Sequence, residues 1–438
     1  MFARKIERVI NQHFNSKSDT ILVIEGARQV GKSFIIRQVG QKMFKHYVEI
    51  NLADDFEGKK IFSDIHDTET FYMQVSILAK GQLGGKDDTL IFLDEIQIYP
   101  HLLTMLKFLR QDNRYTYIAS GSLLGVALHQ STSIPIGSII RKQMFPMDFE
   151  EFLWANGISA DIIQVLRDTF ERHESLDESM HKTILGFFGK YLLSGGLPDA
   201  VKTFVETQNI VQMRSIQSEI HSMYGIDASK YEKEKKLKFR KIYDLVPSFM
   251  ENKKKRVVLK EIEQKAQARF SYYQDEFEYL VASGITLEVR AISNPKFPLV
   301  ESTVKNLLKL YLNDAGLLSN ILFNQNIGAI LHTENSINLG SLYECVVATE
   351  LKAHGHLLYY YDNKTNGEVD YLIDDFEHLS VLPIEVKSGK NYNIHSALSR
   401  FVSVPDYHIK QGIVLSNERE IKTEGEILYL PIYHVMFL

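Results

Sequence analysis

The sequence predicts an α/β protein whose N-terminal domain is built on a parallel β-sheet. Three observations support this prediction. Short apolar, β-branched runs alternate with segments of helical periodicity along the first part of the chain. The first run, at 21–24, leads through a glycine-containing loop directly into a helical segment. Two acidic residues end a later apolar run. Alternating strands and helices favour parallel pairing, which gathers ligand sites at the carboxyl ends of the strands.

Composition limits the class of protein. The chain has 438 residues, of which 45% are hydrophobic and 24% charged, as is typical of globular proteins of roughly two to four domains. The net charge of −5 gives no global reason to expect nucleic-acid binding, so a basic surface has to be local. The single cysteine, Cys345, excludes an intramolecular disulfide and favours a reducing compartment. With no apolar signal-peptide core and no membrane-length apolar run, we expect a cytoplasmic protein without a membrane partner.

The elements of the first domain follow from the hydrophobic periodicity. Helices are expected at 1–14, 34–43, 71–83, 101–110 and 148–154, and strands at 21–24, 47–52, 89–95, 115–119 and 137–147.

The loop at 26–33 reads Gly-Ala-Arg-Gln-Val-Gly-Lys-Ser, the G-x-x-x-x-G-K-S/T pattern of a phosphate-binding loop. Its glycines permit backbone angles that aim consecutive N–H groups at a phosphate. Lys32 can reach the β- and γ-phosphate oxygens, and the Ser33 hydroxyl can ligate Mg²⁺. The cofactors expected from this motif are ATP and Mg²⁺. The expected nucleotide-contacting residues of this segment are Gly26, Ala27, Arg28, Gln29, Val30, Gly31, Lys32, Ser33 and Phe34.

The strand at 89–95 ends in Asp94 and Glu95, about 60 residues after the loop, which is a Walker B pattern. Asp94 would hold Mg²⁺, often through water, and Glu95 would act as general base or position the attacking water. Lys32 and Glu95 are therefore the expected catalytic residues. The acid pair is similar to that of the additional-strand class of ATPases, which includes AAA+ proteins.

Two further residues of this domain have open interpretations. Ser122, after the strand at 115–119, could contact the nucleotide as a γ-phosphate sensor or could cap a helix beginning at Leu123. Arg141 could stabilise transition-state charge in cis or in trans, or could be a solvated arginine on an edge strand.

The middle of the chain is helical and then basic. Residues 156–228 are interpreted as a helical lid or connector, interrupted at 194–198. In 229–330, lysines and arginines concentrate between Lys230 and Lys260. Helical patterns at 259–266 and 271–283 precede a strand-like 285–292, which is the order of a winged helix-turn-helix. Duplex DNA is the candidate partner, through Lys230–Lys260 and Ser271–Ser283, and a solvated basic face is the alternative.

The last segment, 331–438, carries a weak but chemically coherent motif. Glu385 and Lys387 share one face of a strand, and Asp370 on the adjoining strand can join them. With Glu350 from the preceding helix, these residues would form a restriction-endonuclease-like site in which Asp370 and Glu385 hold divalent metal. The alternative is a nuclease-like fold that serves as a scaffold, with its acids paired to lysines.

The order of these motifs resembles a large prokaryotic family of AAA-type P-loop ATPases with a C-terminal restriction-endonuclease-like domain of unknown function. The resemblance covers nearly the whole chain. Its further matching segments are 93–97, Gly121-Ser122, Arg141 with Pro146, 149–152, 195–198, 309–317, Gly340 with Glu344, Glu350-Leu351, 368–370 and 384–387. One departure is Ile139-Ile140-Arg141, where a Gly-Arg pair is usual. The resemblance implies ATP binding, a winged-helix segment and a nuclease-like fold, but no physiological role.

The sequence thus predicts four domains and leaves three functions open. The domains are a P-loop ATPase at 1–155, a helical lid at 156–228, a winged-helix-like domain at 229–330 and a restriction-endonuclease-like domain at 331–438. The favoured function is a Mg²⁺-dependent ATPase coupled to DNA-associated work. The alternatives are a nucleotide-switched protein-interaction module with an inactive nuclease-like domain, and an ATP-regulated metal-dependent nuclease. An oligomer could supply an arginine in trans, but no position identifies it.

Overall fold

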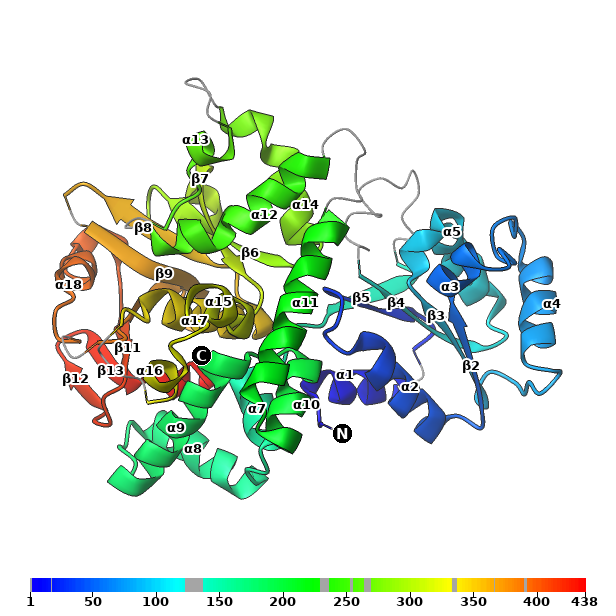
Figure 1. Cartoon of the computed structure of the whole chain (residues 1–438), viewed down its shortest axis with the longest axis horizontal. Coiled ribbons are helices and arrows are strands. Elements are labelled where there is room, and N and C mark those ends of the chain that lie inside the picture. The colour runs from blue at the N-terminus through cyan, green and yellow to red at the C-terminus, as the bar shows by residue number, and fades with distance from the viewer. Residues whose placement is uncertain are drawn as a thin grey trace. The chain divides into compact units, whose positions relative to one another are not determined.

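The computed structural model of the chain (Figure 1) is described here for residues 2–16, 18–122, 137–228, 236–252, 255–263, 269–332, 337–365, 367–389 and 392–438. Its contacts divide the chain into two compact units, 1–145 with 282–284 and 146–281 with 285–438. The first unit therefore ends ten residues before the ATPase boundary predicted at 155.

The first unit contains a five-stranded parallel sheet, and the predicted α/β fold is confirmed. Its strand order is β2-β3-β4-β1-β5, and every neighbouring pair is parallel. The strands are β1 (Ile21–Glu25), β2 (His46–Asn51), β3 (Thr89–Asp94), β4 (Thr116–Gly121) and β5 (Ile139–Gln143). Because β4 lies between β1 and β3, the strand order is that of the additional-strand class. The phosphate-binding loop follows the carboxyl end of β1, and the acid pair lies at the carboxyl end of β3.

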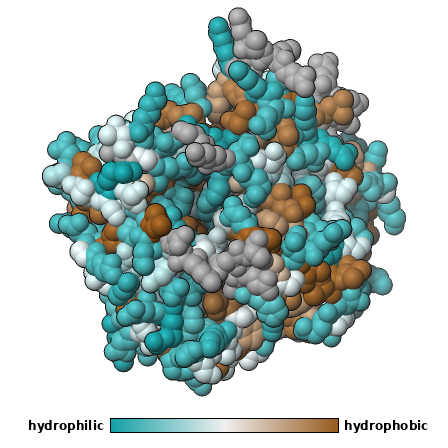
Figure 2. Space-filling view, turned by 60° about the vertical axis from the view of Figure 1, so that its left-hand side comes forward, coloured by the Kyte–Doolittle hydropathy of each residue, from teal (hydrophilic) through white to brown (hydrophobic). Residues whose placement is uncertain are grey.

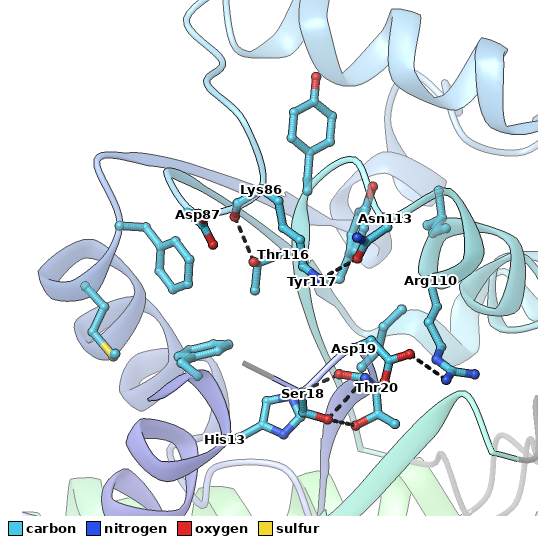
Figure 3. Close-up of a pocket in the computed structure, with 16 residues that line it drawn as sticks. His13, Ser18, Asp19, Thr20, Lys86, Asp87, Arg110, Asn113, Thr116 and Tyr117 are labelled. Carbon is cyan, nitrogen blue, oxygen red and sulfur yellow. Dashed lines mark hydrogen bonds and ion pairs between the residues drawn. The ribbon is translucent and has the colours of Figure 1, made fainter. Parts of the chain in front are cut away.

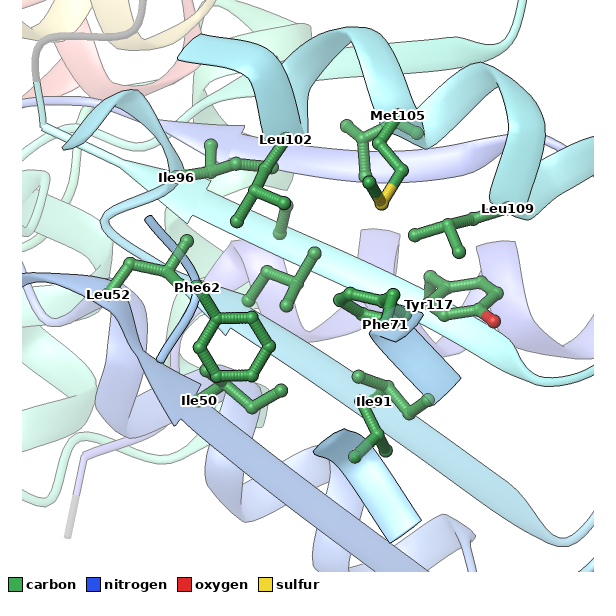
Figure 4. Close-up of a cluster of buried hydrophobic side chains, with 14 of the residues drawn as sticks. Ile50, Leu52, Phe62, Phe71, Ile91, Ile96, Leu102, Met105, Leu109 and Tyr117 are labelled. Atoms are coloured by element: carbon green, nitrogen blue, oxygen red, sulfur yellow. The ribbon is translucent and has the colours of Figure 1, made fainter. Parts of the chain in front are cut away.

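Helices cover both faces of this sheet (Figure 1). They are α1 (Lys5–Asn15), α2 (Lys32–Met43), α3 (Leu52–Glu57), α4 (Thr68–Leu78) and α5 (Pro100–Asp112), with a 3₁₀ turn η1 (Ile96–Ile98). Alternate residues of β3 face opposite sides. Ile91 and Leu93 join a buried cluster with α4 and α5 (Figure 4), whereas Leu90 lies against Gly40 of α2. This two-sided packing fixes the strand ends that carry the motifs.

The second unit contains an eight-stranded mixed sheet, ordered β12-β13-β11-β10-β9-β8-β6-β7. Its strands are β6 (Thr286–Ile292), β7 (Thr303–Leu312), β8 (Tyr359–Asn363), β9 (Gly367–Asp375), β10 (Ser380–Val386), β11 (Gly412–Ser416), β12 (Lys422–Glu424) and β13 (Ile427–Pro431). The 3₁₀ turns are η2 (Phe270–Tyr272), η3 (Leu299–Ser302), η4 (Pro405–Tyr407) and η5 (Ile432–Phe437).

The strand expected to be a short wing, 285–292, corresponds to β6. It pairs with β7 on one side and with β8 on the other, so it belongs to the sheet of the C-terminal segment. Strand pairing is non-local, so the apolar pattern of β6 does not predict which strand pairs with it. The boundary predicted at 330 therefore divides a sheet that the structure keeps together.

The helices of the second unit pack around this sheet and against one another. They are α7 (Phe149–Ala155), α8 (Ala160–Arg172), α9 (Glu178–Ser194), α10 (Pro198–Thr207), α11 (Ile210–Ala228), α12 (Lys236–Glu251), α13 (Leu259–Ile262), α14 (Gln274–Ala282), α15 (Ala315–Leu322), α16 (Ile327–Leu331), α17 (Gly340–Ala353) and α18 (Ser396–Val402). In the described part of the chain, no helix combines the length and the apolar character that crossing a membrane requires. Figure 2 shows a largely hydrophilic face with separate small apolar groups.

Candidate functional site

The loop between β1 and α2 has the backbone that phosphate binding needs. Gly26, Gln29 and Gly31 all have positive φ, at 148°, 64° and 96°. A Cβ on Gly26 would lie 2.2 Å from the Met144 carbonyl oxygen, so only glycine fits there. Gly31 is the N-cap of α2, and no side chain of the described residues caps that helix or adds an acid to its first turn. The positive end of the helix is thus left for an anion.

Lys32 is buried beneath this loop and is held by protein oxygens. Its Nζ donates to the carbonyl oxygens of Gly26 (3.0 Å) and Ala27 (2.8 Å) and to Ser122 Oγ (3.2 Å). Burial lowers the pKa of Lys32 to about 8, although the charges of Glu95 and Asp94 oppose that shift. The ammonium group therefore lies inside the loop, where phosphate oxygens would replace its carbonyl acceptors.

Ser33 and Asp94 place two hard oxygen donors side by side. The Ser33 hydroxyl donates to Asp94 Oδ2 over 2.7 Å, and the Ser120 hydroxyl donates to Asp94 Oδ1. The Glu95 backbone N–H also donates to Asp94 Oδ1, over 3.1 Å. Burial raises the pKa of Asp94, against the two hydroxyl hydrogen bonds. Hydroxyl and carboxylate oxygens are the ligands Mg²⁺ prefers, and nucleotide oxygens and water complete its shell in such sites, so these residues fit the ion.

Glu95 is held at both carboxylate oxygens. Ser122 Oγ donates to Oε1 over 2.9 Å, and Gln97 Nε2 donates to Oε2. Burial raises the pKa of Glu95, but the charge of Lys32 and the hydrogen bonds from Gln97 and Ser122 outweigh it, so the pKa is lowered overall. Ser122 thus connects the ammonium group of Lys32 to the carboxylate of Glu95. The helix expected to begin at Leu123 lies outside the described residues.

The remaining predicted residues lie around the loop. Arg141 on β5 forms an ion pair with Glu25 (Nη2 to Oε2, 2.6 Å), the residue before Gly26. Arg141 therefore lies on an edge strand, as the second interpretation expected, and its charge is paired with that of Glu25. Arg28 acts electrostatically on Lys32 and Glu95, and the Phe34 side chain is half-exposed.

Sequence reasoning missed two members of this site, Ser120 and Gln97. Ser120 is fully buried within β4, where the alternation of the strand directs it toward Asp94. Gln97 stands two residues after Glu95 in a 3₁₀ turn. The signal available was a polar residue next to a motif strand in each case, which is too common to single out.

A separate cavity of about 460 Å³ lies at the other end of the sheet (Figure 3). It is lined where β1 and β4 begin, by Thr20 and Thr116, and by Arg110 near the end of α5. Arg110 pairs there with Asp19 over 2.7 Å. Because the phosphate-binding loop follows the opposite end of β1, this cavity is not the nucleotide site.

The described part of the basic segment is largely paired within the fold. Lys238 pairs with buried Glu276 of α14 (2.8 Å), and Arg240 pairs with Asp244 (3.6 Å). Two more ion pairs join Lys255 to Glu344 and Arg256 to Asp362. Residues 230–235 and 253–254 of the predicted DNA-binding segments, among them Lys230, lie outside the described residues.

The C-terminal acids are brought together with lysines. Lys387 pairs with Glu385 over 2.7 Å, and fully buried Lys309 pairs with Glu368 over 2.6 Å. Asp370 Oδ2 accepts the Val386 backbone N–H over 2.9 Å. Burial and then the charge of Glu385 raise the pKa of Asp370 well above its usual range, and burial also raises the pKa of Glu385.

The helix acid in this cluster is Glu344 rather than the predicted Glu350. Glu344 accepts the Tyr311 hydroxyl over 2.9 Å and pairs with Lys255. Glu350 instead accepts the backbone N–H of Phe149 over 2.7 Å and the Tyr191 hydroxyl. Glu350 therefore anchors α7 to α17, away from Asp370 and Glu385. Among the described residues, no group of three or more His, Cys, Asp or Glu is arranged to hold a metal ion.

Family comparisons agree with the site geometry. Residues 18–153 match the family described as AAA domain. Residues 187–327 and 339–435 match two families described as domains of unknown function, DUF8612 and DUF4143. No protein with a curated description matches the chain.

Three solved structures show a distant resemblance to the chain. The Walker-type ATPase of Pyrococcus abyssi is 13% identical, with 73% of this chain and 96% of that one covered and a TM-score of 0.44. The Aeropyrum pernix Orc1 protein in complex with DNA is 11% identical, with 75% and 92% covered and a TM-score of 0.30. PCH-2 of C. elegans is 9% identical, with 65% and 69% covered and a TM-score of 0.27. Similarity at this level does not bear on function.

The AAA-domain match spans the phosphate-binding loop, the acid pair and the strand order described above. Residues 18–153 therefore form an AAA-type P-loop domain, and two domains of unknown function follow it in the chain.

Proposed function

We propose that this chain is a Mg²⁺-dependent ATP hydrolase. The observation that carries the proposal is a single connected network behind the phosphate-binding loop. Lys32 donates to Ser122, and Ser122 donates to Glu95. The Glu95 backbone N–H and the Ser33 hydroxyl both donate to Asp94. This joins the groups that hydrolysis requires: a phosphate-binding cation, a metal-binding pair and a base for water.

The roles of the residues follow from their contacts. The loop N–H groups and Lys32 would hold the β- and γ-phosphates. Ser33 and Asp94 would hold Mg²⁺, which when bound neutralises charge on the phosphate oxygens. Glu95 would accept a proton from the attacking water, and its lowered pKa favours the ionised form that this role needs.

The direct test is ATP turnover by the purified chain and by Glu95→Gln. We expect Glu95→Gln to lose roughly 10²- to 10⁴-fold in kcat, the range for removal of a general base, and to retain nucleotide binding. Glu49→Gln is the matched control, because Glu49 pairs with Arg37 outside this network, and it should change turnover by less than about twofold. Full turnover by Glu95→Gln would refute the proposal.

The work coupled to hydrolysis is a separate question, with two candidates. The basic segment supports DNA-associated work. The ion pairs at Lys238, Arg240, Lys255 and Arg256 instead favour the second candidate, nucleotide-switched binding of a protein partner, because those charges are already balanced. Turnover measured with and without duplex DNA at several salt concentrations distinguishes them. Stimulation that weakens steeply with salt supports DNA, and indifference to DNA supports the protein-partner candidate.

The lysine partners of Glu344 and Glu368 likewise favour a scaffold role for the nuclease-like segment, since their ammonium groups balance the negative charge that would attract a divalent ion. Metal-dependent strand cleavage by the wild type that is lost in Asp370→Ala would overturn this interpretation.

A further inference from the structure

The side-chain amide of Gln97 carries a donor, Nε2, and an acceptor, Oε1, and the donor already has a partner. Its amide nitrogen Nε2 donates to Glu95 Oε2. The other oxygen of Glu95 accepts the Ser122 hydroxyl over 2.9 Å. Two neutral donors therefore fix the orientation of the carboxylate without cancelling its charge. With either donor removed, the carboxylate would keep one hydrogen bond and gain rotational freedom.

The backbone that carries Gln97 is fixed as well. Glu95 is in the left-handed region (φ 55°, ψ 44°), which is uncommon for a residue other than glycine and clusters at functional sites. The residue between them, Ile96, is fully buried in the core beneath the sheet. The turn Ile96–Ile98 thus holds Gln97 at a set position relative to the acid.

The acceptor of the Gln97 amide has no hydrogen-bond donor in the part of the chain that the structure describes. This oxygen, Oε1, is buried. A buried acceptor without a donor is costly, and such groups in native structures are often completed by a bound molecule. The covalent geometry of the amide keeps this oxygen within a few ångströms of Glu95 Oε2, so a donor that reaches Oε1 lies beside the base.

We propose that Gln97 is a positioning residue for ATP hydrolysis, which orients Glu95 through Nε2 and accepts the second hydrogen of the attacking water through Oε1. This inference rests on the proposed ATP hydrolysis. A water molecule that donates one hydrogen to Glu95 and the other to Gln97 has a lone pair free to attack phosphorus. The proton taken by Glu95 leaves the water as its oxygen bonds to phosphorus and the bond to ADP breaks.

The test compares kcat, KM and ATP affinity for the wild type, Gln97→Met and Gln97→Glu. Methionine keeps the length of the side chain but removes both polar ends. Glutamate keeps the shape, but its carboxylate cannot donate to Glu95. We expect each variant to lose about 10- to 100-fold in kcat, as misplacement of a reacting group does, with ATP affinity within about twofold of wild type. Melting temperatures show that each variant is folded, and the nearly isosteric glutamate variant remains informative if methionine unfolds the chain.

Gln38 on α2 supplies the matched control. Its amide oxygen is also buried and without a hydrogen bond among the described residues, so Gln38→Met should leave kcat within about twofold. A double variant adds a second readout. If Gln97 acts through Glu95, Gln97→Met should cause little further loss of kcat in the Glu95→Gln background.

The outcomes separate the two proposals. An inactive wild type, or full activity in Glu95→Gln, removes the hydrolysis proposal and this inference with it. An active wild type whose Gln97 variants keep kcat, or lose it equally in the Glu95→Gln background, removes this inference alone.

Discussion

The two acidic sites of this chain hold their carboxylates in opposite ways. In the first unit, hydroxyl and amide groups donate to Asp94 and Glu95. In the second unit, the ammonium groups of lysines pair with the acids around Asp370. Neutral donors fix an orientation and leave the negative charge available, whereas cationic partners cancel it. The comparison teaches that clustering of acids alone does not identify a working site, because the partners decide whether charge remains for a metal or a proton.

Removing the charge of Asp94 should lower ATP turnover more than any other change considered below. Asp94→Asn keeps the size of the side chain and removes the charge that would face Mg²⁺, so Mg²⁺-dependent turnover should fall at least about 100-fold through loss of several kcal/mol of transition-state stabilisation. Asp370→Asn is the matched change in the second unit and should leave ATP turnover within about twofold of wild type. Steady-state turnover against Mg²⁺ concentration measures both. Equal losses in the two variants would show that the second unit contributes to the reaction.

The next effect tests what the lysines do. Lys309 is fully buried against Glu368, whose side chain is 25% exposed. Lys309→Met should cost about 3 kcal/mol of unfolding free energy, the low end for a broken buried pair, because Glu368 keeps some contact with water. The double variant Lys309→Met/Glu368→Gln should recover most of that loss, since no unpaired charge remains. Urea unfolding gives all three values, and a single variant as stable as wild type would contradict the pairing.

A smaller effect is expected in the pH dependence of the unfolding free energy. Asp314 lies in the second unit, where its Oδ2 accepts the Gly196 N–H over 2.6 Å, and burial raises its pKa to about 6. Between the unfolded pKa and the folded pKa the native state binds more protons. The stability contribution is therefore complete below about pH 4 and is lost as pH rises through 6, by at most about 3 kcal/mol.

Asp314→Asn should remove this pH dependence, whatever constant change in stability it adds. The measurement is the difference in unfolding free energy between wild type and variant from pH 4 to 7.5. A difference that stays constant over that range would show that Asp314 has the same pKa in the folded and unfolded chain.

The sequence predicts the first site far better than the second because of how each is encoded. The phosphate-binding loop is contiguous, and a parallel sheet gathers Lys32, Asp94 and Ser122 at one edge whatever the lengths of the connections. In the second unit, Glu344 and Glu350 share one helix but stand six residues apart, about 120° around its axis. Only the packing of α17 shows that Glu344 faces the strands.

The sequence also does not predict which strands of the second unit pair with one another. β6 has the alternation of a strand, but its pairing with β8 joins residues about 70 positions apart, and no local pattern specifies such a partner. Gln97 illustrates a third limit, because the sequence does not show that this polar residue in a turn contacts Glu95.

Among the described residues, β5 is the outer strand of the first sheet and pairs only with β1, so one side of its backbone has no strand partner there. Four of its five residues are exposed, among them Arg141 and Lys142. Charged side chains on an outer strand discourage the strands of other molecules from adding to the sheet. We therefore expect Arg141 and Lys142 to protect the folded protein against aggregation, and their replacement by apolar residues to reduce solubility independently of any change in hydrolysis.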